Sequence, residues 1–385
     1  MYEALIIGGG IGGLTLAIAL QQRGIRAAVY EAAPLMRPVG AGILLPPNAM
    51  RIFRQLGLAD KLRDAGVVPA ATEIRDARAG VLQRIDTRLF AERYGEPMVA
   101  IHRGRLHAIL ADALDPAQLH LGKRCSTIHD DSDGIRVRFS DESEAYGNIL
   151  IGADGLRSIV RRQLFPDAAL RYSGQSSFRA IAPVSLPDDL RQTGWEVWGA
   201  GCRFGFTAIA PNQVYWYATM DATEKTLRAD ESGLAQLHQL FAGFPPTVGD
   251  LIAATPAEAI IATDIHDLQP LATWHRGRIG LLGDAAHATT PNLGQGGAQA
   301  VEDAAVLAAC LAANPSDPQQ AFGRYEAQRY AQATMVVERS RSMGRMAHMR
   351  NPLARTLRNG LVRLIPYSIT ERQYDVLFSD RRTPT

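Results

Sequence analysis

Two glycine-rich stretches that lie far apart in the chain carry the residue types best suited to hold a cofactor. The first is residues 8–13, GGGIGG, and the second is residues 283–297, GDAAHATTPNLGQGG. Glycines at the start of a helix leave backbone N–H groups uncovered, so the positive end of the helix dipole can face an anion. A ligand that is gripped by both stretches must be long, anionic and able to react at one end.

The first stretch has the order and spacing of a dinucleotide fingerprint. A short apolar run, residues 4–7, precedes it and is typical of a buried parallel strand. Gly8 allows a tight turn, Gly10 lets a pyrophosphate approach the backbone, and Gly13 lets the helix pack on the strand. Glu31 follows the next expected strand, where a carboxylate can accept the ribose hydroxyls of an adenosine. The segment predicts a Rossmann-like unit without deciding between FAD and NAD.

The second stretch follows another apolar run, residues 279–282, and Asp284 lies just beyond the end of that run. Residues 294–297, GQGG, then open a helix of small and apolar residues. A reduced flavin carries negative charge at its N1–C2 carbonyl edge, and a helix N-terminus aimed there would stabilise that charge. Because one ligand must reach from the first stretch to the second, we expect FAD, with its flavin end beside residues 294–297.

A third glycine-flanked turn, residues 152–158, GADGLRS, follows an apolar strand in the middle of the chain. Asp154 in this turn either contacts a ligand, as at the strand ends of open α/β sheets, or caps the next helix. His287 is expected to be structural, because the sequence places no partner acid or cysteine beside it.

These three motifs resemble, in order and spacing over residues 1–340, those of the single-component (group A) flavoprotein monooxygenases of the para-hydroxybenzoate hydroxylase type. Residues 38–49 resemble the family's flavin-side loop, and residues 101–106, IHRGRL, resemble its segment whose arginine contacts FAD. The resemblance implies bound FAD, with NADPH or NADH as a transient co-substrate. The residues that it places around FAD are Gly8, Gly10, Gly13, Glu31, Gly42, Arg103, Asp154, Asp284, Pro291, Gly294, Gln295, Gly296 and Gly297.

The resemblance also implies the reaction. An oxidoreductase of this kind consumes NAD(P)H and dioxygen to hydroxylate or epoxidise a small, electron-rich aromatic, heteroaromatic or polyene-type molecule, through a flavin C4a-hydroperoxide. The flavin supplies this chemistry, so we expect no metal ion. Three alternatives stay open: an FAD-dependent reductase of the prenyl-reductase type, a non-catalytic FAD-binding partner protein, and an NAD-dependent dehydrogenase.

Aromatic residues concentrate in a region that predicts a separate sheet. Residues 201–210 and 213–220 alternate like two strands joined by a tight turn, with Arg203 on one face of the first and Tyr215 on one face of the second. The opposite faces, which carry Phe, Trp and Val, should form a core. An arginine and tyrosines on one sheet face suit a pocket wall, and the alternative is a solvated face.

In FAD-dependent urate hydroxylases, which this region resembles together with zeaxanthin-epoxidase-like proteins, an arginine and a tyrosine of this sheet touch the substrate. They match Arg203 and Tyr215, whereas Asn292 stands where those enzymes carry an acid. An amide can hydrogen-bond a substrate but cannot act as a carboxylate. The candidate catalytic residues are therefore Arg203, Tyr215 and Asn292, and the substrate stays open.

We expect an α/β fold: a Rossmann-like three-layer FAD-binding domain with an inserted mixed β-sheet substrate domain and a C-terminal helical segment. The FAD-binding domain should span residues 1–170, with residues 71–100 contributing to the substrate domain. The substrate domain should span residues 171–265, and the chain should return to the FAD-binding domain over residues 266–335. Residues 336–385 should form the helical segment.

Composition narrows the remaining possibilities. The net charge is only +2 and the arginines are scattered, which disfavours nucleic acid as a partner. The three cysteines form no CxxC pair, which predicts a cytoplasmic protein without disulfides. No apolar run reaches the ~18 residues that a membrane span needs. We expect a monomer or homodimer that acts on a small-molecule substrate.

The C-terminal segment contains an apolar stripe at near-helical spacing. We expect this stripe to pack on its own protein, and peripheral membrane contact is the alternative. The stripe consists of Leu357, Leu361, Leu364 and Ile365, beside Arg355, Arg358 and Arg363.

Overall fold

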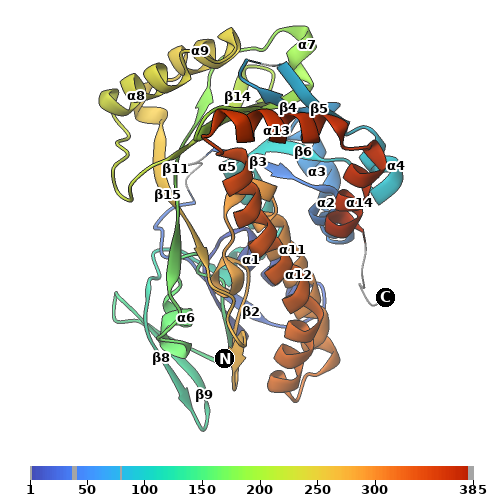
Figure 1. Ribbon diagram of the computed structural model, residues 1–385. Coiled ribbons are helices and arrows are strands. Elements are labelled where there is room, and N and C mark those ends of the chain that lie inside the picture. The colour runs from blue at the N-terminus through green and yellow to red at the C-terminus, as the bar shows by residue number, and fades with distance from the viewer. Residues whose placement is uncertain (1, 37–40, 79, 380–385) are drawn as a thin grey trace.

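The structure, a computed structural model, describes residues 2–36, 41–78 and 80–379. The fold is α/β, as predicted, and is built on two large sheets with helices around them (Figure 1). A third, two-stranded sheet pairs β3 (Gly42–Leu45) with β6 (Val99–His102). The site is assembled where these sheets meet.

The first sheet has β1 (Tyr2–Ile7) near its centre. This strand pairs in parallel with β2 (Ala27–Tyr30) and β10 (Glu144–Gly152), and β10 pairs in parallel with β17 (Ile279–Leu281). The apolar residues of β1 are buried because helices and strands cover both of its faces. The other strands of this sheet are β7 (Leu119–His120), β8 (Cys125–Asp131), β9 (Gly134–Phe139) and β16 (His275–Arg276).

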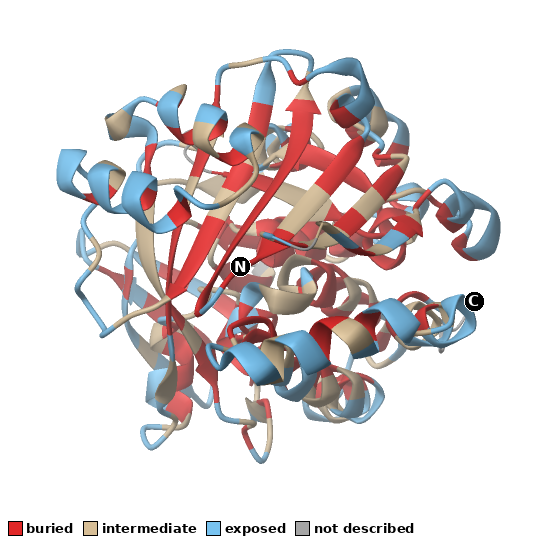
Figure 2. Cartoon of the chain, turned by 45° about the horizontal axis from the view of Figure 1, so that its top comes forward, coloured by how far each residue is buried: buried red, intermediate tan, exposed pale blue. Residues whose placement is uncertain are grey.

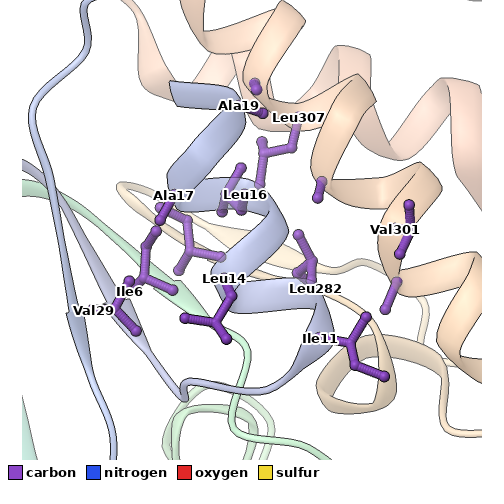
Figure 3. Close-up of a cluster of buried hydrophobic side chains, with 14 of the residues drawn as sticks. Ile6, Ile11, Leu14, Leu16, Ala17, Ala19, Val29, Leu282, Val301 and Leu307 are labelled. Atoms are coloured by element: carbon purple, nitrogen blue, oxygen red, sulfur yellow. The ribbon is translucent and has the colours of Figure 1, made fainter. Parts of the chain in front are cut away.

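Helix α1 (Ile11–Gln21) follows β1 directly and is buried along almost its whole length. It packs against α11 (Gly296–Ala313), so the two helices that begin at the glycine-rich stretches lie side by side. Figure 3 shows side chains of both helices in one cluster, among them Leu16 and Leu307. This close packing explains why both helices consist largely of small and apolar residues.

The second sheet is mixed and has the strand order β15-β11-β14-β13-β12-β4-β5. The two predicted strands are present as β13 (Cys202–Ala210) and β14 (Gln213–Asp221), and their predicted core faces are buried. Phe204 and Trp216 stack there under α8 (Glu231–Phe241) and α9 (Pro246–Ala253). Figure 2 shows these strands as largely buried. The remaining strands are β4 (Ala71–Asp76), β5 (Gly80–Asp86), β11 (Leu170–Ala182), β12 (Thr193–Trp198) and β15 (Ile261–Leu268).

A long helix, α12 (Pro318–Ala347), connects the first sheet to the second. Near its end, Arg341 pairs with Asp267 at 3.0 Å and the Gly344 carbonyl accepts a hydrogen bond from Gln175. Two further helices follow, α13 (Pro352–Leu364) and α14 (Tyr367–Phe378). The shorter helices are α2 (Pro47–Gln55), α3 (Ala59–Asp64), α4 (Leu89–Tyr94), α5 (Arg103–Ala111), α6 (Ile159–Leu164), α7 (Asp188–Arg191) and α10 (Asp284–His287), with single 3₁₀ turns at Pro116–Gln118, Ala257–Ala259 and Pro291–Leu293.

In the described part of the chain, α11 is the one helix long and apolar enough to cross a membrane by length and composition. It is mostly buried against α1, α2 and α12, as a core helix of a globular domain would be.

The C-terminal stripe corrects one prediction. Helix α13 packs on the protein, but Leu357 and Leu364 on the predicted inward stripe are 67% and 78% exposed. The buried positions are instead Arg358, Asn359 and Val362. The expectation that the leucines face inward is wrong, because polar contacts of the opposite face hold the helix.

Candidate flavin and substrate site

The N-terminal turn has the geometry that the fingerprint requires. Gly8 has φ +110°, which favours glycine, and a Cβ on Gly13 would lie 2.0 Å from the Gly8 carbonyl oxygen. At Gly10, by contrast, no heavy atom of the described residues lies within 4 Å of a Cβ position. The turn is thus closed where the helix packs on the strand and open where a pyrophosphate would approach.

Glu31 lies beside this turn at the end of β2. Its carboxylate accepts hydrogen bonds from the backbone N–H of Gly9 at 2.7 Å and of Ala33 at 2.8 Å. These bonds fix the carboxylate next to the glycine turn, at the position where the fingerprint expects a ribose partner.

The two glycine-rich stretches meet in space, as the sequence predicted. A Cβ on Gly12 would lie 2.5 Å from the Leu282 side chain, and one on Gly297 would lie 3.8 Å from Ile11. The N-cap of α11 is Gln295, whose side chain makes no capping hydrogen bond, so the first N–H groups of the helix are left to another acceptor. Residues separated by 270 positions or more therefore border one surface.

Arg103 and Asp284 are two charged residues near this surface, since a Cβ on Gly296 would lie 3.9 Å from Asp284 Oδ1. Both side chains are exposed to solvent, at the start of α5 and of α10. Nevertheless, desolvation by the surrounding protein lowers the pKa of Arg103 and raises the pKa of Asp284. The charges of Arg179, Asp284 and Tyr215 also act on Arg103. Arg103 and Asp284 are thus opposite charges that act on each other in a partly desolvated environment.

Asp154 caps a helix in this structure. Its carboxylate accepts hydrogen bonds from Ser158 Oγ and from the backbone N–H of Ile159 and Val160, at the start of α6. The turn that carries Asp154 lies directly against the fingerprint, because a Cβ on Gly8 would lie 2.4 Å from the Ala153 carbonyl oxygen. Of the two predicted roles, the cap is present, and contact with a cofactor stays a prediction.

His287 is buried and has an acidic partner that the sequence analysis missed. Its Nε2 lies 2.5 Å from Asp303 Oδ2, and Arg329 Nε donates to the other oxygen of Asp303 at 2.8 Å. Burial would raise the pKa of Asp303, yet His287 and Arg329 hold it at about 2. The network ties α10 to α11 and α12. Sequence could not pair these residues, because the contact spans three helices.

On the second sheet, Tyr215 lies against the flavin-side loop. A Cβ on Gly42 would be 2.5 Å from Cβ and Cγ of Tyr215, so only glycine fits there. Burial raises the pKa of Tyr215, which keeps its hydroxyl protonated. Tyr217 lies on the same face, with ring centroids 6.1 Å apart. Pro38, Val39 and Gly40 of the predicted loop lie outside the described residues.

Arg203 contacts Asn292, but its side chain is buried in the second sheet and is not exposed on the sheet face. Only 1% of it is exposed. Its Nε donates to Thr219 Oγ1 at 2.9 Å, its Nη1 to Glu196 Oε1 at 3.2 Å, and its Nη2 to Asn292 Oδ1. The positive charge is therefore matched inside the protein by Glu196.

Glu196 is a site residue that the sequence analysis missed. It lies on β12 and also accepts hydrogen bonds from Tyr217 Oη and from Trp198 Nε1. Although burial opposes it, the charge of Arg203 keeps the pKa of Glu196 below its usual value. An acid alternating with Trp195 and Val197 in an aromatic strand was the available signal.

Arg179 was also missed. It lies on β11 directly opposite Tyr217, so both side chains emerge on the same sheet face. Its Nη2 donates to Thr263 at 3.3 Å, whereas its buried Nε has no hydrogen-bond partner among the described residues. Its charge acts on both Tyr215 and Arg103. Arg179 thus lies on the second sheet, close enough to Arg103 to act on its charge.

Comparison with known proteins identifies the family. A family model described as "FAD binding domain" matches residues 1–340. The chain is 42% identical to aurachin C monooxygenase/isomerase of Stigmatella aurantiaca, over 94% of both proteins. It is 35% identical to 2-heptyl-3-hydroxy-4(1H)-quinolone synthase of Pseudomonas aeruginosa, over 97% of both. The structure of Klebsiella pneumoniae HpxO with FAD and uric acid matches with a TM-score of 0.90 and 30% identity, covering 98% of this chain and 97% of that one.

This chain is a group A flavoprotein monooxygenase. Its cofactor is FAD, its reductant is NAD(P)H, and it hydroxylates an aromatic substrate. Two structural observations agree with this assignment. The approach to Gly10 is open, and the start of α11 offers N–H groups without a side-chain cap. Because the matched relatives are monooxygenases, we reject the three alternatives: the prenyl-type reductase, the NAD-dependent dehydrogenase and the non-catalytic FAD-binding partner.

Proposed function

We propose that this monooxygenase hydroxylates a ring carbon of a neutral, quinolone-like heteroaromatic substrate that bears an apolar substituent. One observation carries the proposal. The Arg203 guanidinium is committed within the wall to Glu196 and Asn292, so it does not offer its charge to a substrate anion. A relative that aligns along nearly the whole chain supports the substrate class, since it is named as a synthase of 2-heptyl-3-hydroxy-4(1H)-quinolone.

Two groups on the pocket face suit the carbonyl oxygen of such a ring. Tyr215 keeps its proton because burial raises its pKa, so its hydroxyl can donate. Arg179 has a buried Nε–H with no partner among the described residues, and an unpaired donor of this kind is costly unless a ligand accepts from it. Together they would orient the ring and favour the electron-rich form from which the ring carbon reacts. Asn292 then has a positioning role, because it holds Arg203.

Residues from both glycine-rich stretches would hold the cofactor. Gly8, Gly10, Gly13 and Glu31 would hold the ADP half, with Asp154 and Arg103 nearby. When bound and reduced, FAD would activate dioxygen for transfer to the substrate ring. The residues that would border the middle and the flavin end are Gly42, Asp284, Pro291, Gly294, Gln295, Gly296 and Gly297.

A substrate panel tests this proposal. The purified holoenzyme is given 2-heptyl-4(1H)-quinolone, uric acid or 6-hydroxynicotinate, and NADPH and NADH oxidation is followed beside peroxide release. We expect only the quinolone to raise oxidation at least tenfold without matching peroxide. Coupled oxidation with uric acid, and none with the quinolone, would overturn the proposal.

A further inference from the structure

Helix α13 carries its apolar face outward. Four leucines on it are strongly exposed: Leu353 by 82%, Leu357 by 67%, Leu361 by 59% and Leu364 by 78%. At 3.6 residues per turn, these four positions fall within about 80° of the helix circumference. Figure 1 shows α13 on the outside of the molecule, beside β4 and β5. A continuous leucine face in water is unfavourable for a free protein and marks an interaction surface.

The opposite face of α13 is polar and fixes the helix. The buried Arg358 donates to the carbonyl oxygen of Ala347 at 2.9 Å, and its guanidinium lies 4.7 Å from the centre of the Trp198 ring. The buried Asn359 donates to Asp76 Oδ2 at 2.8 Å. Rotating the helix to bury its leucines would break these bonds. The leucine face is therefore held outward.

The charged residues of α13 and of the chain beside it are arginines, and Asp76, Asp221 and Asp267 of other elements pair with four of them. Between Glu338 and Glu371 the chain has seven arginines and no acidic residue. Several of these arginines are exposed, including Arg345 next to the end of α12 and Arg363 on α13 itself. Beyond Pro366, Tyr367 and Ile369 add two exposed side chains, each 45% accessible. Leucines flanked by arginines, with an aromatic residue nearby, have the composition of a helix that lies in a membrane interface.

We propose that α13 docks this enzyme on the surface of an anionic phospholipid bilayer, with the face formed by Leu353, Leu357, Leu361 and Leu364 entering the interface. The charge favours a bilayer over a second copy of the chain, because pairing two copies through this face would bring two sets of arginines together. Anionic lipid headgroups would neutralise the same arginines.

A series of side-chain contacts joins α13 to the face of the second sheet that we propose to line the substrate site. Arg358 of α13 stacks on Trp198, which donates to Glu196 at 2.6 Å, and Glu196 holds Arg203 and Tyr217. A substrate with an apolar tail would partition into the bilayer on which the enzyme rests. Delivery of substrate from the bilayer rests on the proposed function, whereas docking itself does not.

Vesicle co-sedimentation tests the inference with the full-length holoenzyme. We expect binding to vesicles of phosphatidylcholine and phosphatidylglycerol, and much weaker binding to phosphatidylcholine alone or in 0.5 M salt. The variant Leu357→Asp/Leu361→Asp should lose at least tenfold in partition, while Leu240→Asp, at an exposed leucine on α8, should bind like wild type. Arg363→Gln should lower binding to the anionic vesicles about fivefold.

The outcomes are distinguishable. FAD absorbance and NADPH oxidation should be the same for the leucine variant and wild type, which shows that the variant is folded. Equal sedimentation of wild type and the leucine variant would overturn the inference. So would a wild-type dimer in analytical ultracentrifugation that the leucine variant disrupts without any vesicle binding. A failed substrate panel would leave the vesicle result unaffected.

Discussion

At the scale of single residues, the predicted substrate face of the second sheet contains a buried ion pair. Arg203 is 1% exposed, and Glu196 is its acidic partner. Breaking a buried pair by removing one partner leaves an uncompensated charge and typically costs about 3 kcal/mol or more. Glu196→Gln should therefore lower the free energy of unfolding by about 3 kcal/mol, measured by urea denaturation. Glu338→Gln, at an exposed position, is the control and should change little. A Glu196→Gln variant as stable as wild type would show that Arg203 is satisfied without its acid.

The contact between Gly42 and Tyr215 gives a second residue-scale prediction. A methyl group at position 42 would lie 2.5 Å from Tyr215, so either the loop or the tyrosine must move. Gly42→Ala should weaken FAD retention at least tenfold, read from the fluorescence of released flavin. Gly323→Ala is a matched control, because no heavy atom of the described residues lies within 4 Å of that Cβ position. Equal flavin retention by both variants would contradict the tight contact.

Hydrogen bonds to the substrate carbonyl belong to the same scale. Arg179→Met and Tyr215→Phe should each raise KM for a quinolone about tenfold, which corresponds to about 1.4 kcal/mol for a lost hydrogen bond. The melting temperature should change little, because neither group is needed to satisfy another buried residue. Steady-state kinetics with coupled turnover make the measurement. Unchanged KM in both variants would remove these residues from the substrate site.

At the scale of elements, the network of Asp303 joins three helices behind the cofactor site. The pKa of Asp303 is held at about 2 in the fold, below its ordinary value of 3.8, so its ionised form stabilises the native state. This contribution is complete well above pH 3.8 and is lost as the pH falls toward 2. Asp303→Asn should therefore melt earlier than wild type by a gap that is constant from neutral pH to about pH 5 and narrows below about pH 4. A gap that widens in acid would contradict the assigned pairing.

Features of single elements could be predicted from the sequence where residue spacing or hydrophobic periodicity alone determines them. The fingerprint turn, the parallel β1–β2 pair and the alternating faces of β13 and β14 all follow from spacing and periodicity. Helix α13 shows the limit of this reasoning. Its period identifies an apolar stripe, but the orientation is set by Arg358 and Asn359, whose partners lie on other elements. Glu196 and Arg179 escaped prediction for the same reason, since their partners Arg203 and Tyr217 lie on other strands of the sheet.

At the scale of the whole molecule, both sheets contribute to one site. The first sheet and the two helices that begin at glycine-rich stretches are the predicted cofactor side, and the second sheet is the predicted substrate side. Gly42 against Tyr215 and Asn292 against Arg203 connect the two sides. Family membership accounts for this architecture, but the fold alone does not specify Asn292 or the buried Arg203–Glu196 pair. Helix α13 contacts the second sheet through Arg358 and Trp198, and its leucines are exposed on the outer side of the molecule.

The most direct test of the central claim is the incorporation of labelled dioxygen. The holoenzyme, NAD(P)H and 2-heptyl-4(1H)-quinolone are incubated under ¹⁸O₂, and the product is examined by mass spectrometry. We predict a hydroxylated quinolone that carries one ¹⁸O atom on a ring carbon, in an amount that matches the NAD(P)H consumed. Recovery of unlabelled quinolone, with all consumed NAD(P)H accounted for as hydrogen peroxide, would contradict the account.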